Sequence, residues 1–216
     1  MITKTPLATP LATLLAVLLV TTLLPACAPL LIGGAAVSSV MVASDRRSSG
    51  AQVEDQSIEL KASSRISDLA LLGNVTVTSY NRTVLITGQV PAEAARVAAE
   101  PAVARVENVR AVVNELAVAG NSSLTTQSAD SIISGKVKAT FIDARDLQSN
   151  ALKVVTEAGV VYLMGIVTER EARRATDLAR SVDGVRKVVR VFEVVSEDAL
   201  ANLVPKTAAP AASAPK

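Results

Sequence analysis

The chain has 216 residues, with 22 basic and 20 acidic side chains, no histidine, one cysteine, two tyrosines and two phenylalanines. The lack of histidine and the single cysteine remove the usual transition-metal ligands, most nucleophile–base pairs and any internal disulfide. The nearly balanced charge gives no case for nucleic acid binding, and no phosphate-cradling glycine loop indicates a cofactor. We therefore expect no cofactor and no enzyme activity, although counting alone leaves a Ser–Lys dyad open.

The first apolar run begins at Leu11 and covers about 14 residues, too few for a bilayer span, which needs roughly 20. This length is typical of the apolar part of a signal peptide. The run ends in Leu24-Pro25-Ala26-Cys27, which resembles the lipobox of bacterial lipoproteins. In that family the segment before the cysteine is cleaved and the cysteine is acylated. The resemblance implies a signal peptide over residues 1–26 and lipidation of Cys27.

Two alternatives to a lipidated cysteine remain. Cys27 could be a small buried hydrophobe of an ordinary signal or core helix. The apolar stretch Ala28–Ala43 could instead be a membrane anchor, although Pro29, Gly33 and Gly34 interrupt it. With an acylated cysteine, residues 27–51 form an apolar segment and a tether, whose polar part is Ser44–Gly50.

Two similar blocks follow the tether, over residues 52–119 and 126–195, with a turn-rich linker at residues 120–125. The first block begins with a helical pattern over Val53–Ile66. Alternating strands over Asn74–Tyr80 and Thr83–Val90 predict a hairpin. The next helix should begin at Pro91 and be kinked or broken at Pro101. The block ends with a strand over residues 109–116.

The second block has the same order. Its expected elements are a helix over Asp130–Ile142, strands over Ala151–Glu157 and Val160–Val167, a second helix, and a strand over Val185–Val194. Thr168 and Glu171 have the spacing of a capping box at the start of the second helix. Gly88 and Gly165 recur at equivalent strand positions, where we expect close approach of the next helix. The tail over residues 196–216, rich in alanine and proline at its end, should be disordered.

Each block therefore reads helix–strand–strand–helix–strand. The strands joined by a helix should pair in parallel, because such crossovers are right-handed and return to the same sheet. The predicted fold class is α+β, with two tandem two-layer sandwiches that each contain a three-stranded mixed sheet. We expect the two blocks to be separate folds with little mutual core.

This arrangement behind a lipobox resembles the dual BON-domain outer-membrane lipoproteins. The resemblance is carried by Asp45–Asp55, by Val161–Ala172 and by the Gly184-Val185 step before Val188. It implies a lipid-anchored protein on the periplasmic face of the outer membrane. It further implies that the second domain binds anionic phospholipid through its first helix and supports envelope integrity.

The helix over Asp130–Ile142 has two faces. Ile133, Val137 and Phe141 recur at helical spacing and should face the sheet. The other face carries apolar and basic residues typical of a helix at a membrane surface. We predict lipid binding by Ile132, Gly135, Lys136, Lys138 and Ala139. The alternative is that Ile132 packs against the neighbouring block.

The second block has eleven basic and nine acidic residues, whereas the first has six and eight. This excess favours the second block for an anionic membrane surface. An ordinary solvated face is at least as good an interpretation of its basic cluster, which comprises Arg173, Arg174, Arg180, Arg186, Lys187 and Arg190. The alternative function is a protein-interaction adaptor or chaperone-like factor in envelope assembly, with envelope proteins bound at exposed sheet edges.

Overall fold

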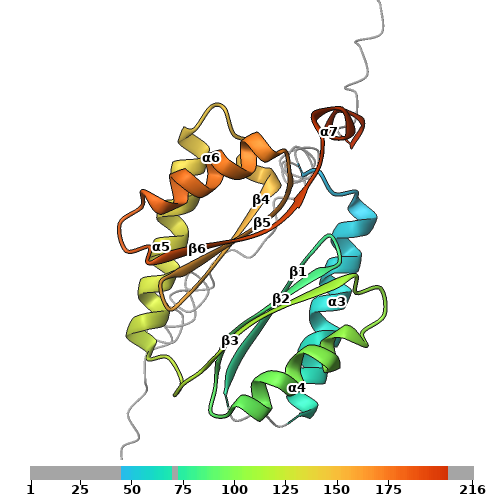
Figure 1. The fold of residues 1–216 in the computed structure, drawn as a ribbon, viewed down its shortest axis with the longest axis vertical. Helices are drawn as coiled ribbons and strands as arrows, with labels where there is room; N and C mark the ends of the chain where they lie inside the picture. Colours follow the sequence, from blue (N-terminus) through green and yellow to red (C-terminus); the bar gives the residue numbers. More distant parts are fainter. Residues whose placement is uncertain (1–44, 70–72, 204–216) are drawn as a thin grey trace, which may run out of the picture. The chain divides into compact units, whose positions relative to one another are not determined.

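A computed structural model describes residues 45–69 and 73–203 (Figure 1). The predicted signal peptide and Cys27 lie outside these residues, as does the tether up to residue 44. The described residues belong to one compact unit, which contains both blocks. We call the blocks domain 1 and domain 2.

Domain 1 contains two helices and a three-stranded sheet in the order β1-β2-β3. Strand β2 pairs antiparallel with β1 and parallel with β3. The elements are α3 (Ser49–Asp68), β1 (Asn74–Tyr80), β2 (Thr83–Val90), α4 (Glu93–Ala104) and β3 (Ala111–Val118). The bounds of the first two strands are those that the alternating pattern predicts.

Domain 2 repeats this topology with the sheet order β4-β5-β6. Strand β5 pairs antiparallel with β4 and parallel with β6. The elements are α5 (Leu124–Asp143), a short 3-10 helix η1 (Ser149–Ala151), β4 (Leu152–Glu157), β5 (Val160–Val167), α6 (Glu169–Arg180) and β6 (Lys187–Val194). The predicted α+β class and the helix–strand–strand–helix–strand order are therefore confirmed in both domains.

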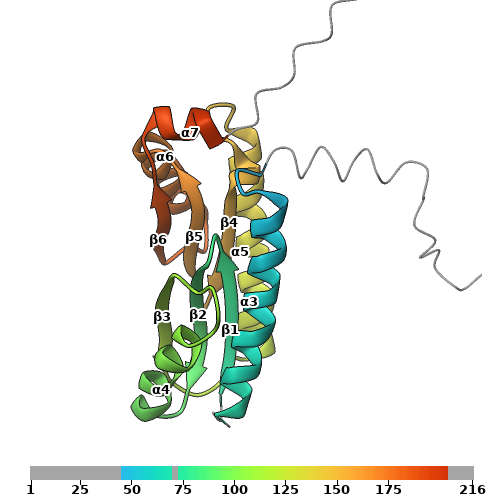
Figure 2. The same cartoon turned by 90° about the vertical axis from the view of Figure 1, so that its right-hand side faces the viewer.

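The two helices of each domain pack on their own sheet. In domain 1, α3 lies along β1 and α4 along β3, while in domain 2, α5 lies along β4 and α6 along β6 (Figure 2). The domain 1 core contains Ile58 and Ala62 of α3 with Val84 and Ile86 of β2. The narrow alanine stripe of α6 lets this helix lie close to its sheet, because Ala172, Ala175 and Ala179 are all buried.

Contrary to the prediction from the sequence, neither Pro91 nor Pro101 marks an end of α4. Helix α4 begins at Glu93, after an N-cap at Ala92, and it continues through Pro101 to Ala104. Proline removes one backbone donor and crowds the preceding turn, so Pro101 leaves α4 without one hydrogen bond but does not end it. Pro101 lies within the last turn of α4, and the predicted break is therefore wrong.

The strand glycines are required by a neighbouring backbone rather than by a helix. A Cβ atom on Gly88 would lie 1.9 Å from the carbonyl oxygen of Asn74, and one on Gly165 would lie 2.6 Å from that of Ala151. Gly88 also has a φ of +120°, which favours glycine. The prediction of close approach is confirmed, but the expected neighbour was wrong.

The chain after β6 is not entirely without structure. Helix α7 (Glu197–Leu203) follows β6, and its Leu200 is buried. The predicted disorder is therefore wrong for Glu197–Leu203, and residues 204–216 lie outside the described part. The linker is also shorter than predicted, because α5 begins at Leu124.

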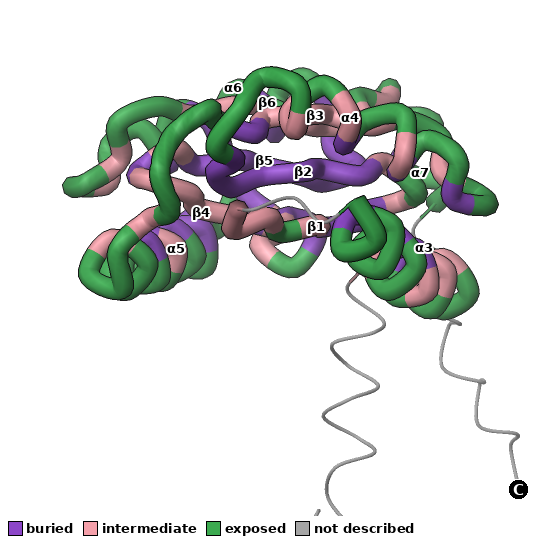
Figure 3. Tube along the Cα trace, turned by 90° about the horizontal axis from the view of Figure 1, so that it is seen from below, coloured by how far each residue is buried: buried purple, intermediate pink, exposed green. Residues whose placement is uncertain are grey.

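The two sheets share an apolar layer on the faces turned away from their helices. Tyr80 and Leu85 of domain 1 form one buried cluster with Tyr162, Met164 and Ile166 of domain 2. Figure 3 shows β2 and β5 as buried strands in the middle of the view. The expectation of little mutual core is therefore wrong.

Candidate membrane-contact site

Helix α5 begins six residues before the predicted start. Ser123 is its N-cap and accepts a hydrogen bond from the Thr126 amide at 3.1 Å. A serine hydroxyl in this position satisfies one of the unpaired donors of the first turn. Ile133, Val137 and Phe141 are buried in the domain 2 core, as predicted.

The opposite face of α5 is exposed and partly apolar. Ile132 is 61% exposed, so the alternative in which it packs against domain 1 is wrong. Leu124 and Ile142 on the same helix are 80% and 69% exposed. At 100° per residue, these three side chains fall within about 80° of one another, opposite the buried face. Gly135 and Ala139 lie between them on this stripe and are also exposed.

Two lysines flank the apolar stripe of α5. Lys136 lies on one edge, where its ammonium is 3.6 Å from the carboxylate of Asp183. Lys138 lies on the other edge and lines a pocket of about 250 Å³ that Phe141 and Ile142 also line. The helix therefore brings all five predicted lipid-binding residues to one exposed surface.

A buried aspartate fixes α5 to the hairpin of its own sheet. The carboxylate of Asp130 accepts hydrogen bonds of 2.7 Å from the amides of Ala158 and Gly159. Both turn residues have positive φ, which is strained for alanine. The carboxylate compensates this strain and sets the position of the helix, including its exposed stripe, on the sheet.

Domain 1 contains the same arrangement of a helix aspartate bound to the hairpin turn. Asp55 of α3 accepts hydrogen bonds from the amides of Asn81 and Arg82 at 2.7 and 2.8 Å. Sequence analysis missed both aspartates. The available signal was the repeat itself, since Asp55 and Asp130 occupy equivalent helix positions and each precedes an equivalent turn.

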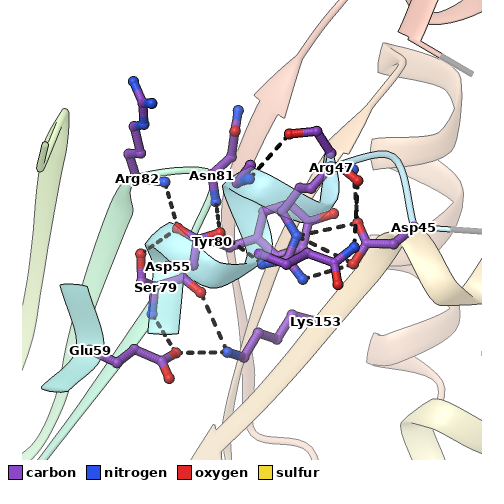
Figure 4. Close-up of polar contacts among 12 residues, drawn as sticks. Asp45, Arg47, Asp55, Glu59, Ser79, Tyr80, Asn81, Arg82 and Lys153 are labelled. Carbon is purple, nitrogen blue, oxygen red and sulfur yellow. Dashed lines mark hydrogen bonds and ion pairs between the residues drawn. The ribbon is translucent and has the colours of Figure 1, made fainter. Parts of the chain in front are cut away.

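The segment before α3 is docked rather than extended as a tether. The Arg47 guanidinium contacts the carboxylates of Asp45 and Asp55, each at 2.8 Å, and stacks 4.0 Å from the centroid of the Tyr80 ring (Figure 4). A cation over an aromatic face is attracted by the ring quadrupole. The expectation that residues 45–50 form a tether is therefore wrong.

Arg46 binds domain 2 although it precedes domain 1 in the chain. Its guanidinium donates two hydrogen bonds to Glu171 at 2.7 and 2.8 Å and one to the Ile166 carbonyl at 2.7 Å. Glu171 completes the predicted capping box with Thr168, which is confirmed. Burial would raise the pKa of Glu171, but the hydrogen bonds from Arg46 and Thr168 outweigh burial and lower it.

Further polar contacts join the two domains around the shared apolar layer. Lys153 of β4 lies 2.9 Å from the carboxylate of Glu59, and Figure 4 shows this pair beside Ser79. Arg110 lies 2.5 Å from the carboxylate of Glu193. These pairs and Arg46 mean that the exposed face of α5 belongs to a two-domain unit.

The described part of the chain contains neither a helix suited to span a membrane nor a cluster of metal-ligating side chains. Between residues 45 and 203, leaving out 70–72, no helix combines the length and apolarity that crossing a membrane requires. Across the same residues, no group of three or more aspartate, glutamate, cysteine or histidine side chains could hold a metal ion.

Similarity to known proteins shows the family to which this chain belongs. The BON domain family matches residues 54–120 and 129–196. Outer membrane lipoprotein DolP of Haemophilus influenzae is 37% identical over 174 residues, which cover 79% of this chain and 89% of that protein. The 21 kDa hemolysin of Actinobacillus pleuropneumoniae is 32% identical over 154 residues, covering 70% and 79% of the two chains. Osmotically-inducible protein Y of Escherichia coli is 30% identical over 118 residues, covering 53% of this chain and 59% of that protein. With two BON domains and this similarity over most of its length, the chain belongs to the family of dual BON-domain outer-membrane lipoproteins.

Proposed function

We propose that the protein binds anionic phospholipid on the periplasmic face of the outer membrane through the exposed face of α5. Acylated Cys27 anchors it there, after removal of the signal peptide over residues 1–26. Binding of this kind would connect the two-domain unit to the membrane and support envelope integrity.

The observation that carries this proposal is the stripe on α5. Ile132 and Ile142 expose large apolar side chains that no other part of the described chain covers. Lys136 and Lys138 flank them and are exposed as well. A surface helix of this composition can place its apolar side chains at the headgroup boundary while its lysines meet lipid phosphates.

The corresponding helix of domain 1 is less suited to this role. Helix α3 also exposes apolar side chains, at Val53 and Leu60. Its charges near them are mixed, with Glu59 and the exposed Lys61 on either side of Leu60, and α5 likewise carries Asp143 beside Ile142. The difference lies between the whole domains, since domain 2 has two more basic than acidic residues and domain 1 has two fewer, which favours α5 for an anionic surface.

The anchor allows this contact to be weak. A single acyl chain holds a protein to a membrane only marginally, whereas two or more hold it stably. Once the protein is anchored, the local concentration of α5 at the membrane is high, so a modest affinity is sufficient for contact. The affinity of the unanchored protein is therefore the property to measure.

The proposal is tested with the mature chain in which Cys27→Ser prevents acylation. We expect this protein to sediment with vesicles that contain phosphatidylglycerol and to remain in solution with pure phosphatidylcholine. Binding should weaken with added salt, because the screening length falls from about 10 Å at 0.1 M to about 3 Å at 1 M. Equal sedimentation with both vesicles, or none with either, would contradict the proposal.

A further inference from the structure

The basic cluster of α6 and β6 separates into two groups. Arg173 and Arg174 each pair with an exposed carboxylate, at 3.4 Å from Glu169 and 2.9 Å from Asp146, and neither lines the hollow formed by the second group. A second group lines a hollow of about 440 Å³ at the junction of α6 and β6. The residues that line it are Arg180, Val185, Arg186, Lys187 and Val188. We call this surface the basic hollow.

One cation of the basic hollow is held in place by the hairpin turn. The Arg186 guanidinium donates a hydrogen bond to the Ala158 carbonyl, and its side chain lies directly over Gly159. The Arg186 amide also donates to the Gly159 carbonyl at 2.9 Å. The same turn is bound by Asp130, so the position of Arg186 is coupled to that of α5.

The carboxylates near the basic hollow are few and exposed. Asp177 is 3.9 Å from Arg180 in an i,i+3 pair whose side chains are both mostly exposed, an arrangement of small energetic value. Asp183 pairs with Lys136 of α5 instead. No carboxylate lines the hollow, and Lys187 has no ion pair within residues 45–69 and 73–203. Three positive charges therefore converge with little compensation.

Domain 1 offers no equivalent surface. The positions equivalent to Arg180 and Lys187 are Ala104 and Ala111, the last residue of α4 and the first of β3. The position equivalent to Arg186 is Arg110, which is paired with Glu193. The basic hollow is thus specific to the domain that carries the exposed stripe of α5.

We propose that the basic hollow binds the phosphate of an anionic lipid headgroup at the edge of α5, an inference that rests on the proposed function. The hollow lies at the Lys136 edge of this helix, because Lys136 contacts Asp183 and the side chain of Ile133 packs against Gly184. A phosphate group meets arginine and lysine donors with charge-assisted hydrogen bonds. The stripe supplies apolar contact, and the hollow supplies recognition of the headgroup.

The test compares two double variants of the Cys27→Ser chain that remove the same charge. R180Q/K187Q removes two positively charged side chains from the lining of the hollow. R173Q/R174Q removes two positively charged side chains that are each paired with a carboxylate. We expect R180Q/K187Q to weaken binding to phosphatidylglycerol vesicles roughly 25-fold, since each of the two basic residues near an anionic surface contributes about fivefold. R173Q/R174Q should change it by less than about threefold, because neither arginine lines the basic hollow and exposed charges away from the contact are screened. Equal losses would show a general effect of net charge and would overturn the site.

A second measurement separates this site from the proposed function. Inorganic phosphate should shift the backbone amide resonances of Arg186 and Lys187 in a saturable manner, and R180Q/K187Q should abolish saturation. If phosphate shifts these resonances but the protein does not bind vesicles, the hollow is a site for free phosphate. This result would contradict the proposal that the bound phosphate belongs to a lipid headgroup. Vesicle binding that R180Q/K187Q leaves unchanged would overturn the basic hollow, while the contact through α5 would stand.

Discussion

Replacing Asp55 with alanine should lower the free energy of unfolding by roughly 3–5 kcal/mol, the range for removing one partner of a buried ion pair. The change leaves the Arg47 guanidinium without one of its carboxylates and the amides of Asn81 and Arg82 without an acceptor. Both turn residues have positive φ and depend on this acceptor. Urea unfolding at pH 7 measures the loss.

The Asp55 carboxylate should also make the free energy of unfolding depend on pH in the acidic range. Burial would raise the pKa of Asp55, but hydrogen bonds from the Arg82 amide, Ser79, Arg47 and the Asn81 amide outweigh burial and lower it. The stabilisation is therefore complete above the unfolded-state pKa of about 3.9 and is lost as the pH falls through the lower folded-state value. In the Asp55→Ala protein, the free energy of unfolding should therefore change less with pH in this acidic range.

A matched control for Asp55 is the exposed Asp68 at the end of the same helix. Asp68→Ala should change the free energy of unfolding by less than about 0.5 kcal/mol, as is usual for surface substitutions. A loss of under about 1 kcal/mol for Asp55→Ala would contradict the role of the buried carboxylate, because one ordinary hydrogen bond accounts for that much.

Replacing Ile132 with aspartate should nearly abolish vesicle binding by the unacylated protein. The change removes an apolar contact worth roughly 2 kcal/mol, about 30-fold in affinity, and adds a negative charge toward an anionic surface. Because Ile132 is 61% exposed in the folded protein, stability should change little. Sedimentation with phosphatidylglycerol vesicles measures binding, and thermal unfolding verifies the fold.

Leu60→Asp is the matched control for this experiment. Leu60 is 75% exposed on α3, the equivalent helix of domain 1, so the change adds the same charge to the same protein. It should reduce vesicle binding by less than about threefold, since a distant exposed charge is largely screened. A folded Ile132→Asp protein that sediments like the wild type would remove α5 from consideration, and loss with Leu60→Asp alone would move the site to α3.

Local patterns predicted the elements that depend on local physics. The alternation of Val75 and Val77 with threonines sets β1, and its bounds agree with the structure. Thr168 and Glu171 predicted the start of α6, because a capping box needs only residues three apart. The spacing of the buried side chains on α5 likewise predicted which face remains exposed.

The contact between the two sheets had a signal in the sequence that alternation alone does not reveal. Val84-Leu85-Ile86 in β2 and the nearly continuous apolar run of β5 are typical of strands buried on both faces. Helices cover one face, so the other face required a partner. In the structure Leu85 and Met164 belong to the shared layer.

The docked segment before α3 could not be predicted in the same way. Arg46 and Glu171 are 125 residues apart, and a polar run with two arginines has the composition of an exposed tether. Only the packed position of α6 brings the carboxylate to the guanidinium. The same limit applies to the basic cluster, because the sequence does not distinguish paired arginines from those that line the basic hollow.

If the exposed face of α5 contacts an anionic membrane, a probe on this face must come close to the lipid headgroups. An environment-sensitive fluorophore is attached at Ser128→Cys on the α5 stripe or at Ser64→Cys on the exposed face of α3, both exposed positions, in the Cys27→Ser chain. The vesicles contain phosphatidylglycerol and lipids that carry a quencher near the headgroup. We expect quenching of the Ser128→Cys label and little change for Ser64→Cys. Quenching of the Ser64→Cys label alone, or of both labels equally, would contradict it.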